Sequence, residues 1–173
     1  MGDFSHSLLI LAATQMLTPS IGVIEAAQVA GLLYVWRNIV QVATSYPIGV
    51  LADRYGQRSV LIAGYSLGIL TAALTAYAFA TGEGTVAMLA GIFFAAGLYV
   101  AVQEALESTV TAEMVSQDTL ATSYGALGTV NGGAKFVSSA AVGVLWTAVS
   151  PTFSFAAAAI LMAAGTLALM RVR

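Results

Sequence analysis

The fold of this chain is decided by one stretch of sequence, Gly49-Val50-Leu51-Ala52-Asp53-Arg54-Tyr55-Gly56-Gln57-Arg58-Ser59-Val60-Leu61, whose charges lie between two long apolar runs at 26–52 and 60–80. Each run is long enough for a helix that crosses a bilayer, which needs about 20 apolar residues. The stretch therefore predicts the polar turn of a membrane hairpin. Asp53 is suited to cap a helix start, Gly49 and Gly56 permit positive φ, and Arg54 and Arg58 suit cytoplasmic headgroups.

Composition indicates that the whole chain lies in the membrane. Of its 173 residues, 59% are hydrophobic and only 8% are charged, and the mean hydropathy is +0.89. Because soluble domains usually carry about 25% charged residues, we expect an all-α integral membrane protein with a single transmembrane domain, 1–173. The net charge of −2 is too small to suggest a nucleic acid partner.

Chemical catalysis is not expected. The lack of cysteine excludes disulfides, thiolate metal sites and cysteine nucleophiles. There is a single histidine, and no Ser/His/Asp arrangement, phosphate loop or nucleotide signature is present. We therefore predict no catalytic residues, no metal site, no cofactor and no enzyme activity.

Apolar segments and breaker residues predict six helices, and the first of them is short. About fourteen residues at ~1.5 Å each span ~21 Å, less than the ~30 Å hydrocarbon core. This first helix is expected to stop before Pro19, with a loop over 18–25. The predicted ranges are 4–17, 26–52, 60–80, 85–114, 120–148 and 152–170.

The distribution of charge predicts an orientation. If the turn at Asp53 faces the cytoplasm, alternation of the spans also puts the C-terminus there. Arg54, Arg58, Arg171 and Arg173 then lie on the cytoplasmic side, as the positive-inside rule requires. We expect a multi-pass protein with a cytoplasmic C-terminus.

The stretch at 49–61 resembles a signature of the major facilitator superfamily. That family carries G-x-L-a-D-r-x-G-r-[rk]-x-x-l in the cytoplasmic loop between its second and third helices, and often again between the eighth and ninth. One position departs, because Gln57 stands where a basic residue is usual. The matching residues are Gly49, Leu51, Ala52, Asp53, Arg54, Gly56, Arg58 and Leu61.

Nearly the whole chain is similar to the C-terminal half, helices seven to twelve, of a bacterial transporter of this family, with the seventh helix truncated. Asn38, Gly97 and Glu104 are among the residues that carry this similarity. It implies a six-helix bundle, half of the family's fold, in a bacterial cytoplasmic (inner) membrane. The chain departs from the relatives at Arg37, Gln41 and Lys135, where aromatic or apolar residues are usual. It departs again in the loop before the eleventh helix, where Ser116 replaces an expected proline and Leu120 an expected arginine.

Seven polar residues inside the predicted spans are the candidates for a binding site or an interface: Arg37, Asn38, Gln41, Gln103, Glu104, Glu107 and Lys135. A charge at the bilayer centre costs at least about 2.5–3.5 kcal/mol, so such residues usually face a cavity or a partner. Their spacing places Arg37 with Gln41, and Glu104 with Glu107, on shared helix faces. One interpretation is a substrate cage or proton relay built on Glu104. The other is structural, with Glu107 bracing the arginines of the 49–61 stretch and Lys135 contacting a partner.

Two functions are consistent with these patterns. The first is an accessory or structural subunit of a larger membrane complex, favoured by the short first helix and by Arg37 and Lys135 as docking charges. The alternative is half of a secondary transporter for a small polar solute, with possible proton coupling. Alternating access requires two halves around a midplane site, so this function needs a homodimer or a second six-helix half. The expected partners are the bilayer and either other membrane subunits or that second half.

Overall fold

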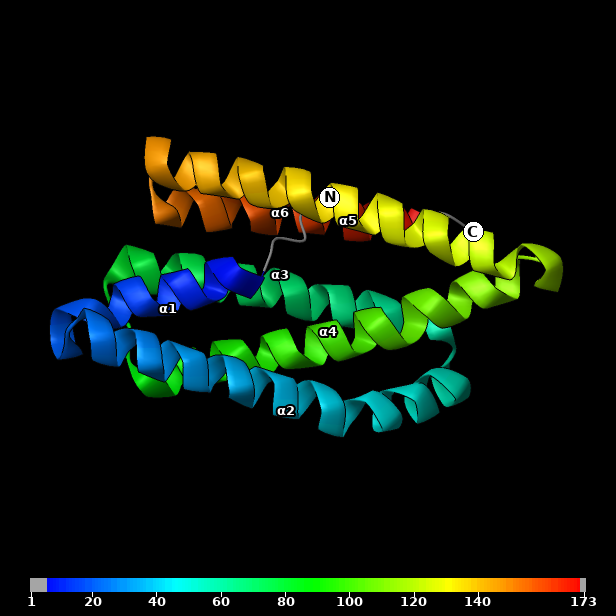
Figure 1. Ribbon diagram of the computed structural model, residues 1–173, viewed down its shortest axis with the longest axis horizontal. Coiled ribbons are helices and arrows are strands. Elements are labelled where there is room, and N and C mark those ends of the chain that lie inside the picture. Colours follow the sequence, from blue (N-terminus) through cyan, green and yellow to red (C-terminus); the bar gives the residue numbers. More distant parts are fainter. Residues whose placement is uncertain (1–5, 172–173) are drawn as a thin grey trace.

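The structure is a computed structural model that describes residues 6–171, and among these the side chains of all but residues 6, 108, 110–114 and 117. The described residues form six α-helices and one short 3-10 turn, so the predicted all-α fold is confirmed. Figure 1 shows the helices running side by side along one long axis. In chain order they are α1 (His6–Ile21), α2 (Val23–Tyr55), α3 (Gln57–Thr81), α4 (Val86–Met114), η1 (Gln117–Thr119), α5 (Leu120–Ala148) and α6 (Pro151–Arg171).

The first helix is longer than predicted, and the expected loop at 18–25 is wrong. α1 continues through Pro19 to Ile21, and α2 begins at Val23. Gly22 alone reverses the chain, with φ of 82°. Proline has a helical φ near −65°, so Pro19 is accommodated in the last turn while the glycine supplies the break. The predicted start at Phe4 lies outside the described residues.

The turn at the signature stretch is also a single glycine. α2 ends at Tyr55 and α3 begins at Gln57, with Gly56 between them at φ 88°. The Gly56 amide donates to the Ala52 carbonyl at 2.9 Å. Asp53 therefore lies in the last turn of α2, and its predicted role as the cap of a helix start is wrong. A single residue with positive φ reverses the chain, so helical hydrogen bonding continues past the aspartate.

Helix packing leaves α5 as the least attached element. The most extensive contacts join α3 with α6 and α2 with α4, whereas α5 packs mainly on α6 and meets α4 lightly. Small residues permit the close contacts. A Cβ atom added to Gly97 of α4 would lie 2.7 Å from the Arg37 carbonyl oxygen of α2, and one added to Gly68 of α3 would lie 3.1 Å from the ring of Tyr99. These glycines therefore let the helices approach each other closely.

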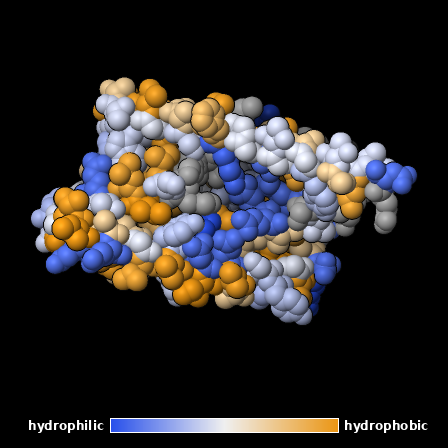
Figure 2. All heavy atoms as spheres, viewed as in Figure 1, coloured by the Kyte–Doolittle hydropathy of each residue, from blue (hydrophilic) through white to orange (hydrophobic). Residues whose placement is uncertain are grey.

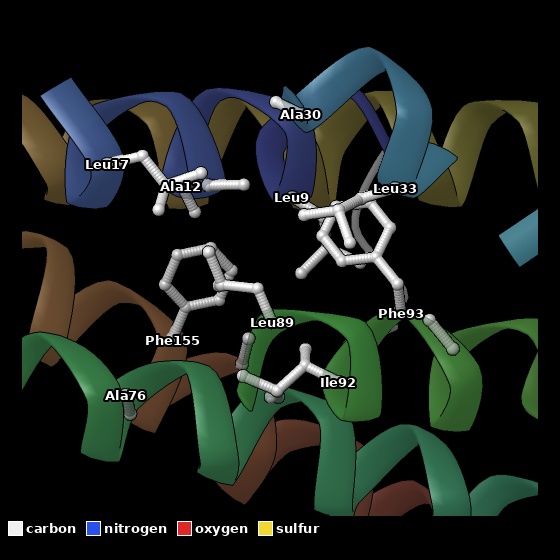
Figure 3. Packing of buried hydrophobic residues seen from close by; sticks show 14 of the residues in the cluster. Leu9, Ala12, Leu17, Ala30, Leu33, Ala76, Leu89, Ile92, Phe93 and Phe155 are labelled. Carbon is white, nitrogen blue, oxygen red and sulfur yellow. The ribbon is translucent and has the colours of Figure 1, made fainter. Parts of the chain in front are cut away.

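The main core is built mostly from α1, α2 and α4, and α3, α5 and α6 contribute further buried residues (Figure 3). Phe93 of α4 and Phe155 of α6 are its largest fully buried side chains. In Figure 3 the ring of Phe155 points toward Leu89 and toward Leu17 of α1. This core joins six helices, mainly at the end of the molecule where α1 and α2 meet.

Among the described residues, three helical segments are long and apolar enough to cross a membrane by themselves: 57–81, 86–107 and 151–171. α1 contributes a shorter apolar helix over 7–21. α2 and α5, which complete the bundle, carry Arg37, Gln41 and Lys135. The polar residues of the chain are therefore concentrated on particular helices, and this concentration positions the candidate site.

Candidate functional site

Polar side chains collect on one face of the bundle. Figure 2 shows hydrophilic residues gathered in a hollow at the centre of this face, between α5 and α2. Three hydrogen bonds described below, Gln41–Glu104, Asn131–Glu107 and Tyr65–Glu107, join α2, α3 and α5 to α4. The site thus consists of the inward faces of α2 and α5 with α4 between them.

The first connection joins α2 to α4. Gln41 Nε2 donates to Glu104 Oε2 at 2.5 Å. Gln41 is half-buried, whereas Glu104 is exposed on the surface of this chain. The next residue, Gln103, is buried at 6% exposure. α4 therefore turns Glu104 out of the bundle and Gln103 into it, and the carboxylate lies where a solute or a partner can reach it.

Arg37 lies deeper on the same face of α2. Its side chain is only 3% exposed, its Nη1 donates to Asn38 Oδ1 at 2.7 Å, and its guanidinium lies 5.6 Å from the Tyr34 ring centroid. The cation is thus held by a neutral amide and an aromatic face. Gly97 permits this arrangement, because α4 passes closely over the Arg37 backbone.

Glu107 forms the second connection, and it joins three helices. Its Oε1 accepts from the Tyr65 hydroxyl of α3 at 2.7 Å, and its Oε2 accepts from Asn131 Nδ2 of α5 at 2.7 Å. The Asn131 bond is one attachment between α4 and α5, two helices that meet lightly. Lys135 is half-buried one turn after Asn131 on α5, which places it on the same side of that helix.

Sequence reasoning missed Tyr65 and Asn131. Asn131 precedes Lys135 by four residues, and this spacing on one helix face was a usable signal. No comparable signal marks Tyr65 among the residues of α3. Of the predicted residues, the structure brings together Gln41 with Glu104 and Arg37 with Asn38.

The signature stretch lies at the other end of α2, where Ala52 and Val60 are buried in a second apolar cluster. Its arginines have different surroundings from one another. Arg58 Nη2 donates to the carbonyls of Leu169 and Met170 at 3.0 and 3.1 Å. A cation is favourable at a helix C-terminus, where carbonyl groups lack partners. Arg54 instead lies over the ring of Tyr55 at 5.6 Å. The structural alternative predicted that Glu107 braces these arginines. For Arg58, the structure shows a contact with the carbonyls at the end of α6 instead.

An all-α bundle with apolar spans, a polar face inside them and arginines at one end defines a multi-pass membrane protein. More particularly, the chain belongs to the Major Facilitator Superfamily, whose sequence pattern matches residues 3–173. It is 29% identical over 156 residues to an uncharacterized MFS-type transporter, MJ1317, of Methanocaldococcus jannaschii. That alignment covers 90% of this chain and 37% of the relative, so the chain spans well under half of the relative's length. Comparison with solved structures gives no significant match.

Proposed function

We propose that this chain is one six-helix half of a secondary carrier and that it lines a polar path through the membrane together with a second six-helix half. The observation that carries the proposal is the polar face, on which Glu104 is exposed beside Gln41 in the middle of the bundle. An exposed carboxylate at this depth is costly in lipid, so it requires a water-filled cavity or a polar partner. A second half that faces α2, α4 and α5 supplies both.

The glycines of α5 support the same arrangement. A Cβ atom added to Gly125, Gly128 or Gly132 would meet nothing within 4 Å, so these glycines serve no close contact with the part of the chain that the structure describes. Each glycine in a helix costs about 0.5–1 kcal/mol relative to alanine. The presence of these glycines is explained if a helix from the second half approaches α5 closely. This is a carrier role, with no enzyme activity.

The orientation proposed for this carrier half places the C-terminus in the cytoplasm. Arg58 contacts the last turn of α6, and Figure 1 shows the α2–α3 and α4–α5 connections at the same end as the C-terminus. Arg54, Arg58 and Arg171 therefore share one end of the bundle, which the positive-inside rule assigns to the cytoplasm. The membrane is then the cytoplasmic membrane of a bacterial cell.

An accessory subunit of a larger membrane complex is the second candidate. It is favoured by Arg37 and Lys135, which stand where the family pattern has aromatic or apolar residues. For Arg37 the burial within this chain counts against a docking role. Lys135 is half-buried, so it stays the more suitable docking charge.

Because the chain has no cysteine, single cysteines can test the proposal without knowledge of the solute. In membrane vesicles, Gln41→Cys should react with a membrane-impermeant maleimide, because the carrier path contains water. The adjacent Val42→Cys is the control, since this residue is 77% exposed on the outside of α2 and should lie in lipid. If Gln41→Cys does not react with the maleimide in native membranes, but does react once detergent has extracted the protein from a larger complex, the accessory role is supported and the carrier proposal is overturned.

A further inference from the structure

A cavity of about 660 Å³ lies between α5 and α6. Twelve residues line it, and they include Gly133, Val137 and Ala141 of α5 and Ala157 and Leu161 of α6. On α5 the lining extends over 129–145, which corresponds to about 24 Å along the helix. Val137 and Leu161 are 66% and 53% exposed, so the cavity is open to the surroundings of the bundle along one side.

The lining selects an apolar ligand. Its side chains are aliphatic apart from Thr129 and Ser138, and the Thr129 hydroxyl already donates to the Gly125 carbonyl at 2.9 Å. An ordered water needs two to four polar partners, which this surface does not provide. The volume falls within the roughly 300–1,000 Å³ typical of small-molecule sites.

The extent of the lining favours a slender chain over a docked protein. α5 lines the cavity for about 24 Å, whereas α6 lines it only over 157–161, so the cavity is elongated along α5. A stable protein interface also uses about 20–30 residues on each side, more than the twelve found here. The inner wall reaches Val142 and Ala158, which are buried parts of the main core.

We propose that this cavity binds one acyl chain of a membrane lipid, aligned with α5 and inserted between α5 and α6. An unfilled cavity would deprive its walls of van der Waals contacts, and the hydrocarbon of the bilayer is the apolar material available beside it. The length of the cavity exceeds one leaflet, which is about half of the ~30 Å core. The acyl chain would fill the cavity between α6 and α5, the helix that has few contacts with the rest of the bundle. This inference does not depend on the carrier proposal.

The test uses the full protein in vesicles of phosphatidylethanolamine and phosphatidylglycerol that contain a trace of phosphatidylcholine with a diazirine at the end of one acyl chain. After illumination, mass spectrometry locates the labelled residues. We expect labels on cavity-lining residues of both α5 and α6. Ala141→Phe should fill the cavity and reduce this labelling about tenfold, equivalent to about 1.4 kcal/mol.

The matched control is Ala140→Phe, which adds the same side chain to an exposed neighbour outside the cavity. It should leave the labelling of cavity residues within twofold of the unmodified protein. Ala157→Phe fills the cavity from α6 and replaces Ala141→Phe if that variant does not fold. Equal labelling in the filled and control variants would mean that lipid only surrounds the bundle, and the proposal would be wrong. Labelling confined to residues outside the cavity would overturn it as well.

Discussion

The contact between α2 and α4 at Gly97 predicts a large effect from one methyl group. In Gly97→Ala the new Cβ would lie 2.7 Å from the Arg37 carbonyl oxygen and 3.0 Å from Val40 Cβ. Even weak C–H···O contacts keep carbon and oxygen about 3.3–3.6 Å apart. The obstacle is backbone, which no rotamer change can relieve, so α4 has to move away from α2.

The magnitude follows from two opposing terms. Overpacking of this kind costs typically about 1–3 kcal/mol, and replacement of a helical glycine by alanine returns about 0.5–1 kcal/mol. The two ranges leave a net loss of up to about 2.5 kcal/mol, centred on about 1 kcal/mol, which lowers the Tm of a chain of this size by about 2–4 °C at that central value. The same movement should weaken the bond between Gln41 and Glu104, which crosses this interface.

The assay is thermal unfolding of the detergent-solubilised protein, with Gly91→Ala as the control. Gly91 lies on the same helix, and a Cβ atom there would meet nothing within 4 Å. Gly91→Ala should therefore raise the Tm, by about 1–4 °C. If Gly97→Ala is as stable as Gly91→Ala, then α2 and α4 do not pack as described, and the geometry of the site is wrong.

Three further perturbations test other contacts. Glu107→Leu removes the acceptor shared by Tyr65 and Asn131 and should cost about 1–3 kcal/mol in unfolding free energy; a double-mutant cycle with Asn131→Leu should give a coupling of at least about 0.5 kcal/mol, and additive effects would contradict the contact. Arg58→Ala should speed hydrogen exchange in the last turn of α6, whereas Arg54→Ala should not; equal exchange in both would exclude the cap on α6. Gly56→Ala should destabilise by about 1–2 kcal/mol because of its positive φ alone, and a neutral result in thermal unfolding would show that the turn has another conformation.

The sequence was sufficient for the helices and insufficient for some of their ends. Apolar length is a local property, so the six helices could be predicted directly from it. The end of α1 was misjudged because Pro19 looked like the breaker, while Gly22 performs the reversal three residues later. Asp53 was misjudged for the same reason, since a single glycine at position 56 suffices for the turn.

For the candidate site, the sequence indicated which residues are polar inside the membrane and left their partners open. Gln41 and Glu104 are 63 residues apart, and Tyr65 and Glu107 are 42 apart. Such pairings depend on which helices are neighbours and how each is rotated about its axis. The periodicity of one segment does not contain that information.

The sequence by itself determined the membrane location, the number of helices, the polar turn at Gly56 and the family, because apolar length and breaker residues act locally. Only the tertiary structure decided that Arg58 caps α6, that Glu107 joins α3, α4 and α5, and that a cavity lies beside the contact between α5 and α6. These features arise where helices distant in sequence meet. Their contacts are set by the fit of side chains across each interface, which exists only once the helices have packed.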